Sequence, residues 1–158
     1  MTMQGHKILV VDDETSMREL LEIVLGNDGY EVRTAPNIGE AKQILAREVF
    51  DVVVTDLRMG QNRNAGMQLL AWLHENNPQI PAIMITAHGS VESAIEAMKL
   101  GAADYILKPF KNEEIRLLVR RAIEQRNLVR ENVALRNEQA KRGRLDNIIG
   151  TSPAIETV

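Results

Sequence analysis

Chemically active side chains follow four short apolar segments of this sequence. Two carboxylates, Asp12 and Asp13, follow the first segment, and a third, Asp56, follows the next. A hydroxyl, Thr86, and an amine, Lys108, follow the remaining two. Clustered carboxylates repel one another, so such a group is tolerated only where cations share the site. If these side chains meet in the fold, they predict a site for a cation and a transferable anion.

The oxygen-rich set favours a magnesium ion, because Mg2+ binds through one or two carboxylates, several waters and a phosphate oxygen. Asp56 could then attack phosphorus as a nucleophile, with the ion and Lys108 stabilising the oxygens of the transferring group. The predicted chemistry is transfer of a phosphoryl group onto Asp56. Taken singly, each residue has a structural alternative: Asp12 or Asp13 could cap a helix, and Thr86 or Lys108 could be an ordinary structural residue.

The apolar segments have the pattern of β-strands that alternate with helices. Predicted strands cover residues 7–11, 31–35, 51–55, 81–86 and 103–107, helical periodicity covers 17–25, 91–98 and 115–123, and weaker helices fit 38–48 and 66–76. The alternation predicts an α/β fold with a parallel sheet covered on both faces. In such a sheet, ligands bind beyond the carboxyl ends of the strands. The segment 31–35 alternates in polarity, so we expect it at an edge.

Local signals mark several helix ends. Ser16 with Glu19 and Asn37 with Glu40 have the spacing of capping boxes. Gly29 and Gly101 lie where two of the helices are expected to end.

Composition limits the class of protein. The chain has 158 residues, 44% hydrophobic, a formal net charge of -3 and no cysteine, which excludes disulfides and thiolate metal sites. Residues 1–110 hold nine basic and fifteen acidic residues, whereas 111–144 hold ten and five. No signal peptide or membrane span is expected, and a cytoplasmic location fits best. The basic segment lacks interleaved aromatics, so we expect no DNA binding by this part.

A long helix is predicted from residue 112 to about 142, where Pro and Gly are absent. Leu128, Asn132 and Leu135 have the d, a, d spacing of a coiled coil, and a polar Asn at an a position can fix register and dimer state. The alternative is a single solvated amphipathic helix.

Four segments, 8–14, 54–59, 85–87 and 101–110, resemble the motifs of response-regulator receiver domains. The resemblance covers roughly residues 5–125. It implies a flavodoxin-like (CheY-like) doubly wound sheet of five parallel strands, in the order 2-1-3-4-5, to which the long helix predicted above adds an extended C-terminal helix. It also implies that Asp56 accepts a phosphoryl group from a sensor histidine kinase.

By the same resemblance, Asp12, Asp13 and Asp56 would hold Mg2+ together with the backbone carbonyl of Arg58. Lys108 would bind the phosphoryl oxygens.

Signalling would follow from two further residues. Thr86 would move toward the phosphoryl group and Tyr105 would turn inward, which changes the face formed by the fourth helix, fifth strand and fifth helix. Homodimers would form through this face and the linker. The resemblance also implies a cis peptide bond between Lys108 and Pro109.

The sequence departs from the family pattern after the acceptor. The segment 60–65 makes this loop about two residues longer than usual, and we expect altered kinase docking. Arg58 and His88 flank the expected pocket and could affect the lifetime of the phosphoryl group, although surface placement without function is the simpler interpretation.

The last segment, 145–155, resembles the opening of the AAA+ ATPase domain in sigma-54-dependent activators of the NtrC type. We therefore expect a receiver at 5–125, a helical coiled-coil linker at 126–144 and the start of a truncated AAA+ domain at 145–158. ATP hydrolysis and contact with sigma-54 RNA polymerase would belong to the absent part, so this part is expected not to be an enzyme.

Two alternatives come from other classes. An aspartyl phosphatase would need a second acid two residues after its nucleophile, and neither Asp13 nor Asp56 has one. A phosphorylation-independent receiver-like scaffold or dimerisation module would be expected to lack part of the acid, hydroxyl and lysine set, which is complete here.

Overall fold

The computed structural model describes residues 5–87 and 90–126, in which strands and helices alternate. The elements are β1 (Lys7–Val11), α1 (Thr15–Gly26), β2 (Glu31–Ala35), α2 (Ile38–Arg47), β3 (Val52–Asp56), α3 (Ala65–Asn76), β4 (Ala82–Thr86), α4 (Val91–Lys99) and β5 (Asp104–Leu107). A C-terminal helix begins at residue 112 and its described part reaches 126. His88, the linker residues Leu128, Asn132 and Leu135, and the predicted AAA+ segment lie outside the described residues.

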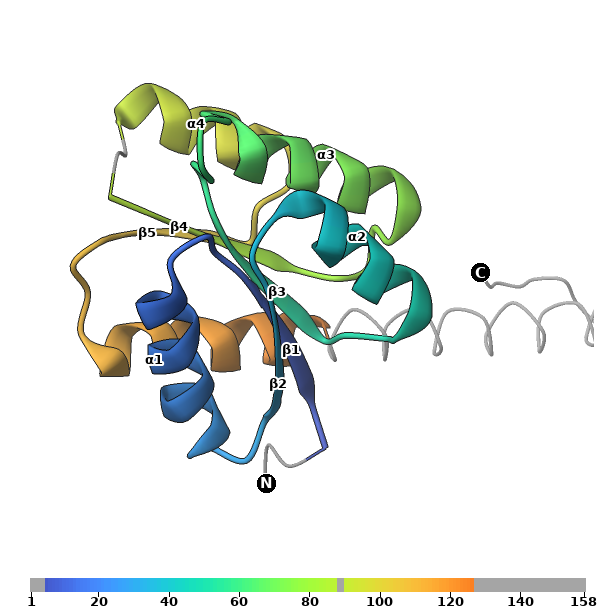
Figure 1. Cartoon of the computed structure of the whole chain (residues 1–158), viewed down its shortest axis with the longest axis vertical. Helices are drawn as coiled ribbons and strands as arrows, with labels where there is room; N and C mark the ends of the chain where they lie inside the picture. Colours follow the sequence, from blue (N-terminus) through green and yellow to red (C-terminus); the bar gives the residue numbers. More distant parts are fainter. Residues whose placement is uncertain (1–4, 88–89, 127–158) are drawn as a thin grey trace, which may run out of the picture. The chain divides into compact units, whose positions relative to one another are not determined.

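The five strands form one parallel sheet in the order β2-β1-β3-β4-β5 (Figure 1). This confirms the predicted fold and strand order. The connection reverses direction between β1 and β3, so the carboxyl ends of these two strands flank the point where ligands bind in such sheets.

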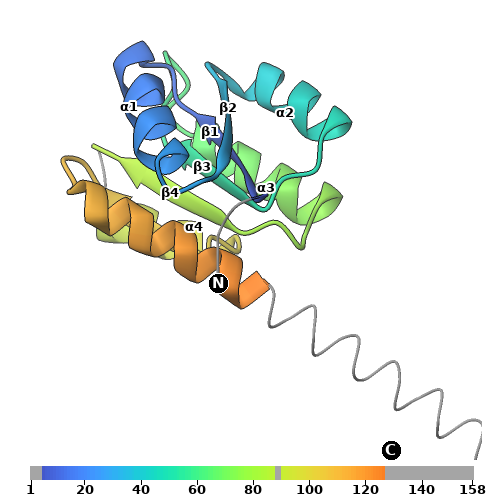
Figure 2. The same ribbon diagram turned by 90° about the horizontal axis from the view of Figure 1, so that it is seen from below.

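Helices cover both faces of the sheet. On one face α2, α3 and α4 pack over Leu9, Val11 and Val53, and on the other α1 and the C-terminal helix pack over Ile8 and Val10 (Figures 1 and 2). Successive strand residues point to opposite faces, so a strand covered on both sides must be apolar throughout. β3 and β4 are buried along their whole length.

The edge strand β2 differs from the central strands. Its residues alternate between exposed and less exposed positions, as predicted. Lys7 pairs with Glu48 at 2.7 Å and lies 3.8 Å from Glu31, and Arg33 also pairs with Glu48 at 2.7 Å. Charged side chains therefore border this edge of the sheet.

Helix ends follow the predictions in part. The side chain of Asn37 accepts the N–H of Glu40 at 2.9 Å, as expected, and Gly29 and Gly101 have positive φ angles of 92° and 99°. The predicted Ser16 cap is wrong, because α1 already begins at Thr15 and the Asp12 carboxylate instead accepts the N–H of Glu14 at 2.9 Å.

A capping box that the sequence analysis missed begins α4. Ser90 and Ser93 exchange hydrogen bonds between side chain and backbone, at 3.0 and 2.9 Å. Serine in place of the usual Glu or Gln at the third helical position hid this signal.

The chain divides into two units, Met1–Ile123 and Glu124–Val158, and the site described below belongs to the first. In this first unit, Arg116 on the C-terminal helix forms a bidentate ion pair with Asp28, just after α1, at 2.7 and 2.9 Å. Within the described ranges, no helix has the length and apolar character that a membrane crossing requires.

Candidate functional site

The carboxyl ends of β1, β3, β4 and β5 place the predicted residues at one edge of the sheet. Asp56 ends β3 and Thr86 ends β4, while Asp12 and Lys108 follow β1 and β5 directly. Backbone pairing continues beyond these strand ends, since the N–H of Lys108 donates to the carbonyl of Thr86 at 2.8 Å. The backbone at the site is therefore fixed by the sheet itself.

Three carboxylates form a cluster at this edge. One ligand oxygen from each of Asp12, Asp13 and Asp56 lies within 4.8 Å of the others. Asp12 and Asp56 are buried, with 2% and 7% of their surface exposed, whereas Asp13 is exposed. Hard oxygen ligands at this spacing suit a divalent cation such as Mg2+.

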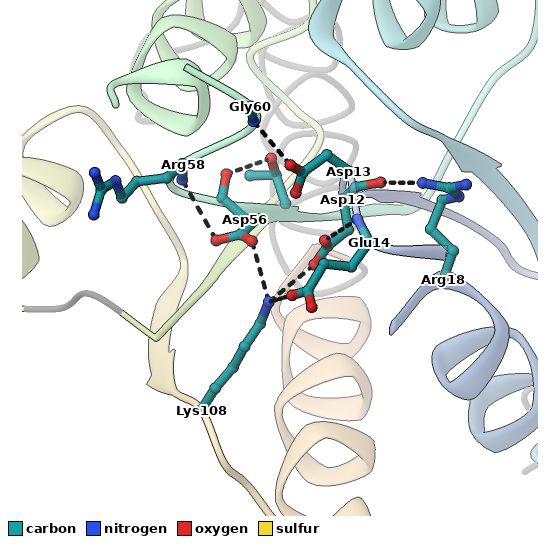
Figure 3. Close-up of polar contacts among 9 residues, drawn as sticks. Asp12, Asp13, Glu14, Arg18, Asp56, Arg58, Gly60 and Lys108 are labelled. Atoms are coloured by element: carbon teal, nitrogen blue, oxygen red, sulfur yellow. Dashed lines mark hydrogen bonds and ion pairs between the residues drawn. The ribbon is translucent and has the colours of Figure 1, made fainter. Parts of the chain in front are cut away.

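Lys108 lies between carboxylates from two strand ends (Figure 3). Its Nζ is 3.1 Å from Oδ2 of Asp12 and 3.1 Å from Oδ2 of Asp56, and 3.4 Å from Oε1 of Glu14. The ammonium thus offsets part of the negative charge. Glu14 was not singled out by the sequence analysis, although it stands directly after Asp12 and Asp13.

Burial and charge act in opposite directions on these groups. Burial raises the pKa of Asp12, and the N–H of Glu14 and the Lys108 ammonium offset only part of that rise. Burial alone would lower the pKa of Lys108, but the Asp12 and Asp56 carboxylates together raise it above its ordinary value. Lys108 is therefore firmly cationic at neutral pH.

The loop after β3 contributes backbone groups. The N–H of Arg58 lies 3.4 Å from Oδ1 of Asp56, and the N–H of Gly60 donates to Oδ2 of Asp13 at 2.8 Å (Figure 3). Gly60 was noted in the sequence only as part of a longer loop. Its contact depends on the path of that loop, which residue spacing does not reveal.

Gly66 presses the start of α3 against the end of β3. A Cβ atom at this position would lie 2.5 Å from the carbonyl oxygen of Asp56 and 2.7 Å from Sδ of Met84. The backbone N–H of Gly66 also donates to the carbonyl of Leu57 at 2.9 Å. Only glycine allows this approach, so Gly66 lets the start of α3 lie directly against the end of β3.

Tyr105 lies on β5, apart from the carboxylate cluster. Its hydroxyl is 2.9 Å from Oγ of Ser93, the residue that also closes the capping box of α4. Thr86 is fully buried at the end of β4. The peptide bond between Lys108 and Pro109 is cis, as the resemblance implied.

Exposed apolar side chains lie along α4, β5 and the C-terminal helix. Val91, Ile95 and Met98 on α4 are 76%, 51% and 51% exposed, Leu107 on β5 is 53% exposed and Leu117 on the C-terminal helix is 48% exposed. Side chains of this size exposed on three elements suit an interaction surface.

Comparison with known proteins identifies the family. The model of the family described as "Response regulator receiver domain" matches residues 8–120. The chain belongs to this family. The receiver is a two-component phosphoacceptor, as the sequence motifs predicted, and the alternative of a phosphorylation-independent scaffold is not favoured.

Relatives of this receiver agree with the NtrC type expected from the sequence. It is 40% identical to "Response regulator protein PilR" of Pseudomonas aeruginosa over 99% of this chain and 33% of PilR. The structure of NtrX from Brucella abortus in complex with ADP has a TM-score of 0.77 and 35% identity, covering 86% of this chain and 29% of NtrX. The beryllofluoride-activated NtrC4 receiver domain dimer has a TM-score of 0.72 and 36% identity, covering 76% of this chain and 98% of that one. The chain spans about a third of the length of PilR and of the similar curated regulator AlgB of Pseudomonas aeruginosa.

Proposed function

We propose that Asp56 accepts a phosphoryl group from the phosphohistidine of a sensor histidine kinase in a Mg2+-dependent step. The observation that carries the proposal is the position of Lys108, 3.1 Å from both Asp12 and Asp56 beside a three-carboxylate cluster. This arrangement gives Asp56 a cation on one side and two further carboxylates with which it could share a second cation.

The carboxylates of Asp12, Asp13 and Asp56 would hold Mg2+, with the backbone carbonyl of Arg58 as a further ligand. This set is supported by the spacing of the acids, since one carboxylate oxygen from each lies within 4.8 Å of the others. The bound ion would supply positive charge that offsets the negative charge of the phosphoryl oxygens.

The transfer itself requires one oxygen of Asp56 to form a bond to phosphorus. The bond from phosphorus to the histidine nitrogen breaks, and its electron pair stays on the imidazole. The Lys108 ammonium, already 3.1 Å from Oδ2 of Asp56, would then contact a phosphoryl oxygen. Thr86, at the end of the neighbouring strand, would donate its hydroxyl to another.

Phosphorylation would bias an equilibrium between two arrangements of α4 and β5. Movement of Thr86 would open space for the Tyr105 ring, which must leave the Ser93 hydroxyl to turn inward. The exposed apolar side chains of α4, β5 and the C-terminal helix would then take part in a homodimer, together with the linker at 126–144.

In a longer cytoplasmic protein, the receiver would control an AAA+ ATPase that activates sigma-54 RNA polymerase. The similarity to PilR over 33% of its length supports a longer protein of this kind. The receiver itself would be a phosphoacceptor and not an enzyme acting on separate substrates.

Incubation with acetyl phosphate, with and without Mg2+, tests the acceptor. We expect the intact mass to rise by one phosphoryl group in the wild type with Mg2+, and no rise in Asp56→Asn. Asp51→Asn is the matched control, because Asp51 precedes the same strand at its opposite end. A rise that survives Asp56→Asn, or that does not need Mg2+, would contradict the mechanism.

The linker is tested by sedimentation of chains that end at residue 124 and at residue 142. We expect the longer chain to dimerise at lower concentration after treatment with beryllofluoride and Mg2+. Equal dimerisation of the two chains would remove the linker from the proposal.

A further inference from the structure

The long loop after β3 is an ordered turn. Met59 and Asn62 exchange two backbone hydrogen bonds, both 3.1 Å long, around Gly60 and Gln61. Gly60 has a φ angle of +62°, in the left-handed region that glycine adopts without strain. The side chain of Met59 is buried in the core that includes α3, so the turn starts from a fixed point.

Side chains attach the other end of the turn to α3. Nδ2 of Asn62 donates to Oε1 of Gln68 at 2.9 Å, and Oδ1 of Asn62 accepts the N–H of Asn64 at 3.1 Å. The two extra residues therefore do not form a loose excursion. They build a short hairpin that is held at both ends.

The hairpin directs one backbone group at the acidic cluster. The N–H of Gly60 donates to Oδ2 of Asp13 at 2.8 Å. Among the residues that the structure describes, this N–H is the hydrogen-bond partner of the Asp13 carboxylate. The ammonium of Lys108 pairs with Asp12, Glu14 and Asp56, and not with Asp13. Asp13 is also the one exposed member of the cluster.

We propose that Gly60 is a positioning residue for Asp13, whose carboxylate its N–H orients for the divalent cation before the ion arrives. An exposed aspartate otherwise samples several rotamers, and ordering it on binding costs affinity. Groups that hold a metal ligand from behind commonly strengthen metal binding in this way. The inference rests on the proposed function of the cluster as a Mg2+ site.

The turn offers a matched pair of variants. A Cβ atom at Gly60 would meet nothing within 4 Å, so a substitution there acts through the backbone alone. Valine strongly disfavours a positive φ, whereas asparagine tolerates it. Gly60→Val should therefore displace the N–H from Asp13, and Gly60→Asn should keep it.

Titration of the 158-residue chain with MgCl2, followed by calorimetry, measures the effect. We expect Gly60→Val to weaken Mg2+ binding by about 3- to 10-fold, at or below the usual effect of such partners because Asp13 is exposed. Gly60→Asn should restore binding to within about twofold. Gly101→Val, which places the same strain at a φ of +99° outside the site, should leave the affinity unchanged.

A second readout needs no metal. In an amide NMR spectrum without Mg2+, Asp13→Ala should shift the Gly60 N–H signal upfield, because a hydrogen bond to a carboxylate moves an amide proton downfield. Asn62→Ala, which removes the attachment to α3, should weaken Mg2+ binding in the same direction as Gly60→Val and keeps the test valid if Gly60→Val does not fold.

The outcomes separate the two proposals. Failure of the wild type to bind Mg2+ would overturn the proposed function and this inference with it. Two other results would overturn the positioning role alone. One is that Gly60→Val and Asn62→Ala both bind Mg2+ with the affinity of the wild type. The other is that Asp13→Ala leaves the Gly60 N–H signal unshifted.

Discussion

Lys108 is shared among carboxylates before any phosphoryl group is present. Its contacts to Asp12 and Asp56, both 3.1 Å, hold the ammonium inside the cluster. Phosphorylation of Asp56 would replace an acceptor of single negative charge with a group that carries more charge and three oxygens. The Lys108 ammonium would need only a small movement to contact a phosphoryl oxygen, since it already lies beside Asp56.

Substitution of Gly66 tests the packing beside Asp56, the proposed acceptor. Gly66→Ala should destabilise the domain by about 1–3 kcal/mol, because the new Cβ would lie 2.5 Å from the Asp56 carbonyl oxygen. It should also slow acetyl phosphate labelling, since the end of β3 must shift. Urea denaturation and mass spectrometry measure the two effects.

Gly26→Ala is the control for Gly66→Ala. Gly26 ends α1, and a Cβ there would meet nothing within 4 Å. Its substitution should be neutral or stabilise by at most about 1 kcal/mol. If the two variants were equally stable, the close approach at Gly66 would not exist in solution.

The sequence allowed some of these residues to be predicted and concealed others. Asp12, Asp56 and Lys108 could be predicted to meet, because residues that follow parallel strands must share one edge of the sheet. The roles of Glu14 and Gly60 depend on how far a side chain reaches and how a loop turns. Neither property is encoded in the spacing of residues along the chain.

At the scale of elements, one serine hydroxyl joins the start of α4 to β5. Ser93 Oγ donates to the carbonyl of Ser90 at 3.1 Å and lies 2.9 Å from the Tyr105 hydroxyl. Either hydroxyl can donate in this contact, since the single proton of Ser93 can point to the Ser90 carbonyl or to Tyr105. The half-buried Tyr105 side chain thus shares a hydrogen bond with a group that also stabilises the start of the helix.

Ser93→Ala should release Tyr105 toward its inward position without phosphorylation. With 3-fluorotyrosine incorporated, the chain has two fluorine signals, and buried Tyr30 serves as the reference. We expect the Tyr105 signal of Ser93→Ala to move part of the way toward its position in beryllofluoride-treated wild type. Ser90→Ala, which weakens the cap but keeps the Ser93 hydroxyl, should move it less. Equal movement in both variants would assign the effect to the helix start instead.

The ion pairs beside β2 predict a pH-dependent contribution to stability. The hydrogen bond from Lys7, aided by Arg33, lowers the pKa of Glu48 despite some loss of water around its carboxylate. A group whose pKa is lowered by folding stabilises the folded protein at pH values above its unfolded pKa, which is about 4.3 for Glu. This stabilisation is lost as the pH falls through the pKa of the folded state.

Glu48→Gln should therefore melt at a lower temperature than wild type at pH 7. The difference should shrink as the pH falls below about 4.3. Exposed Glu22 on α1 provides a control, since Glu22→Gln should melt like wild type at both pH values. If the melting temperatures of Glu48→Gln and the wild type differed as much at pH 3 as at pH 7, this ion pair would not be the cause of the difference.

For elements, the sequence was informative where periodicity was strong. All five strands were predicted within a residue or two, because β-branched apolar runs and helical spacing alternate clearly. The start of α1 was misplaced, since the Asp12 carboxylate provides the turn that Ser16 was expected to supply. A capping pattern in the sequence can therefore be overridden by a hydrogen bond to a residue of the candidate site.

At the scale of the whole molecule, a cation bound at the acidic cluster would couple binding to folding. A ligand that binds only the folded chain stabilises it by about 1.4 kcal/mol for each tenfold excess over its dissociation constant. We expect MgCl2 to raise the melting temperature of the wild type by several degrees more than NaCl at equal ionic strength. Asp13→Asn should reduce this gain, and an identical rise with both salts would argue against a specific site.

The charged border of β2 has a consequence for chains at high concentration. The outer edge of an end strand carries unpaired backbone groups that could pair with a strand of another chain and start aggregation. Glu31 and Arg33 would have to lose water to permit such pairing, and Arg33 would have to leave Glu48. Collisions along this side should therefore be unproductive. A receiver at high concentration should therefore be protected from fibre formation along β2, which lies at the opposite end of the sheet from β5.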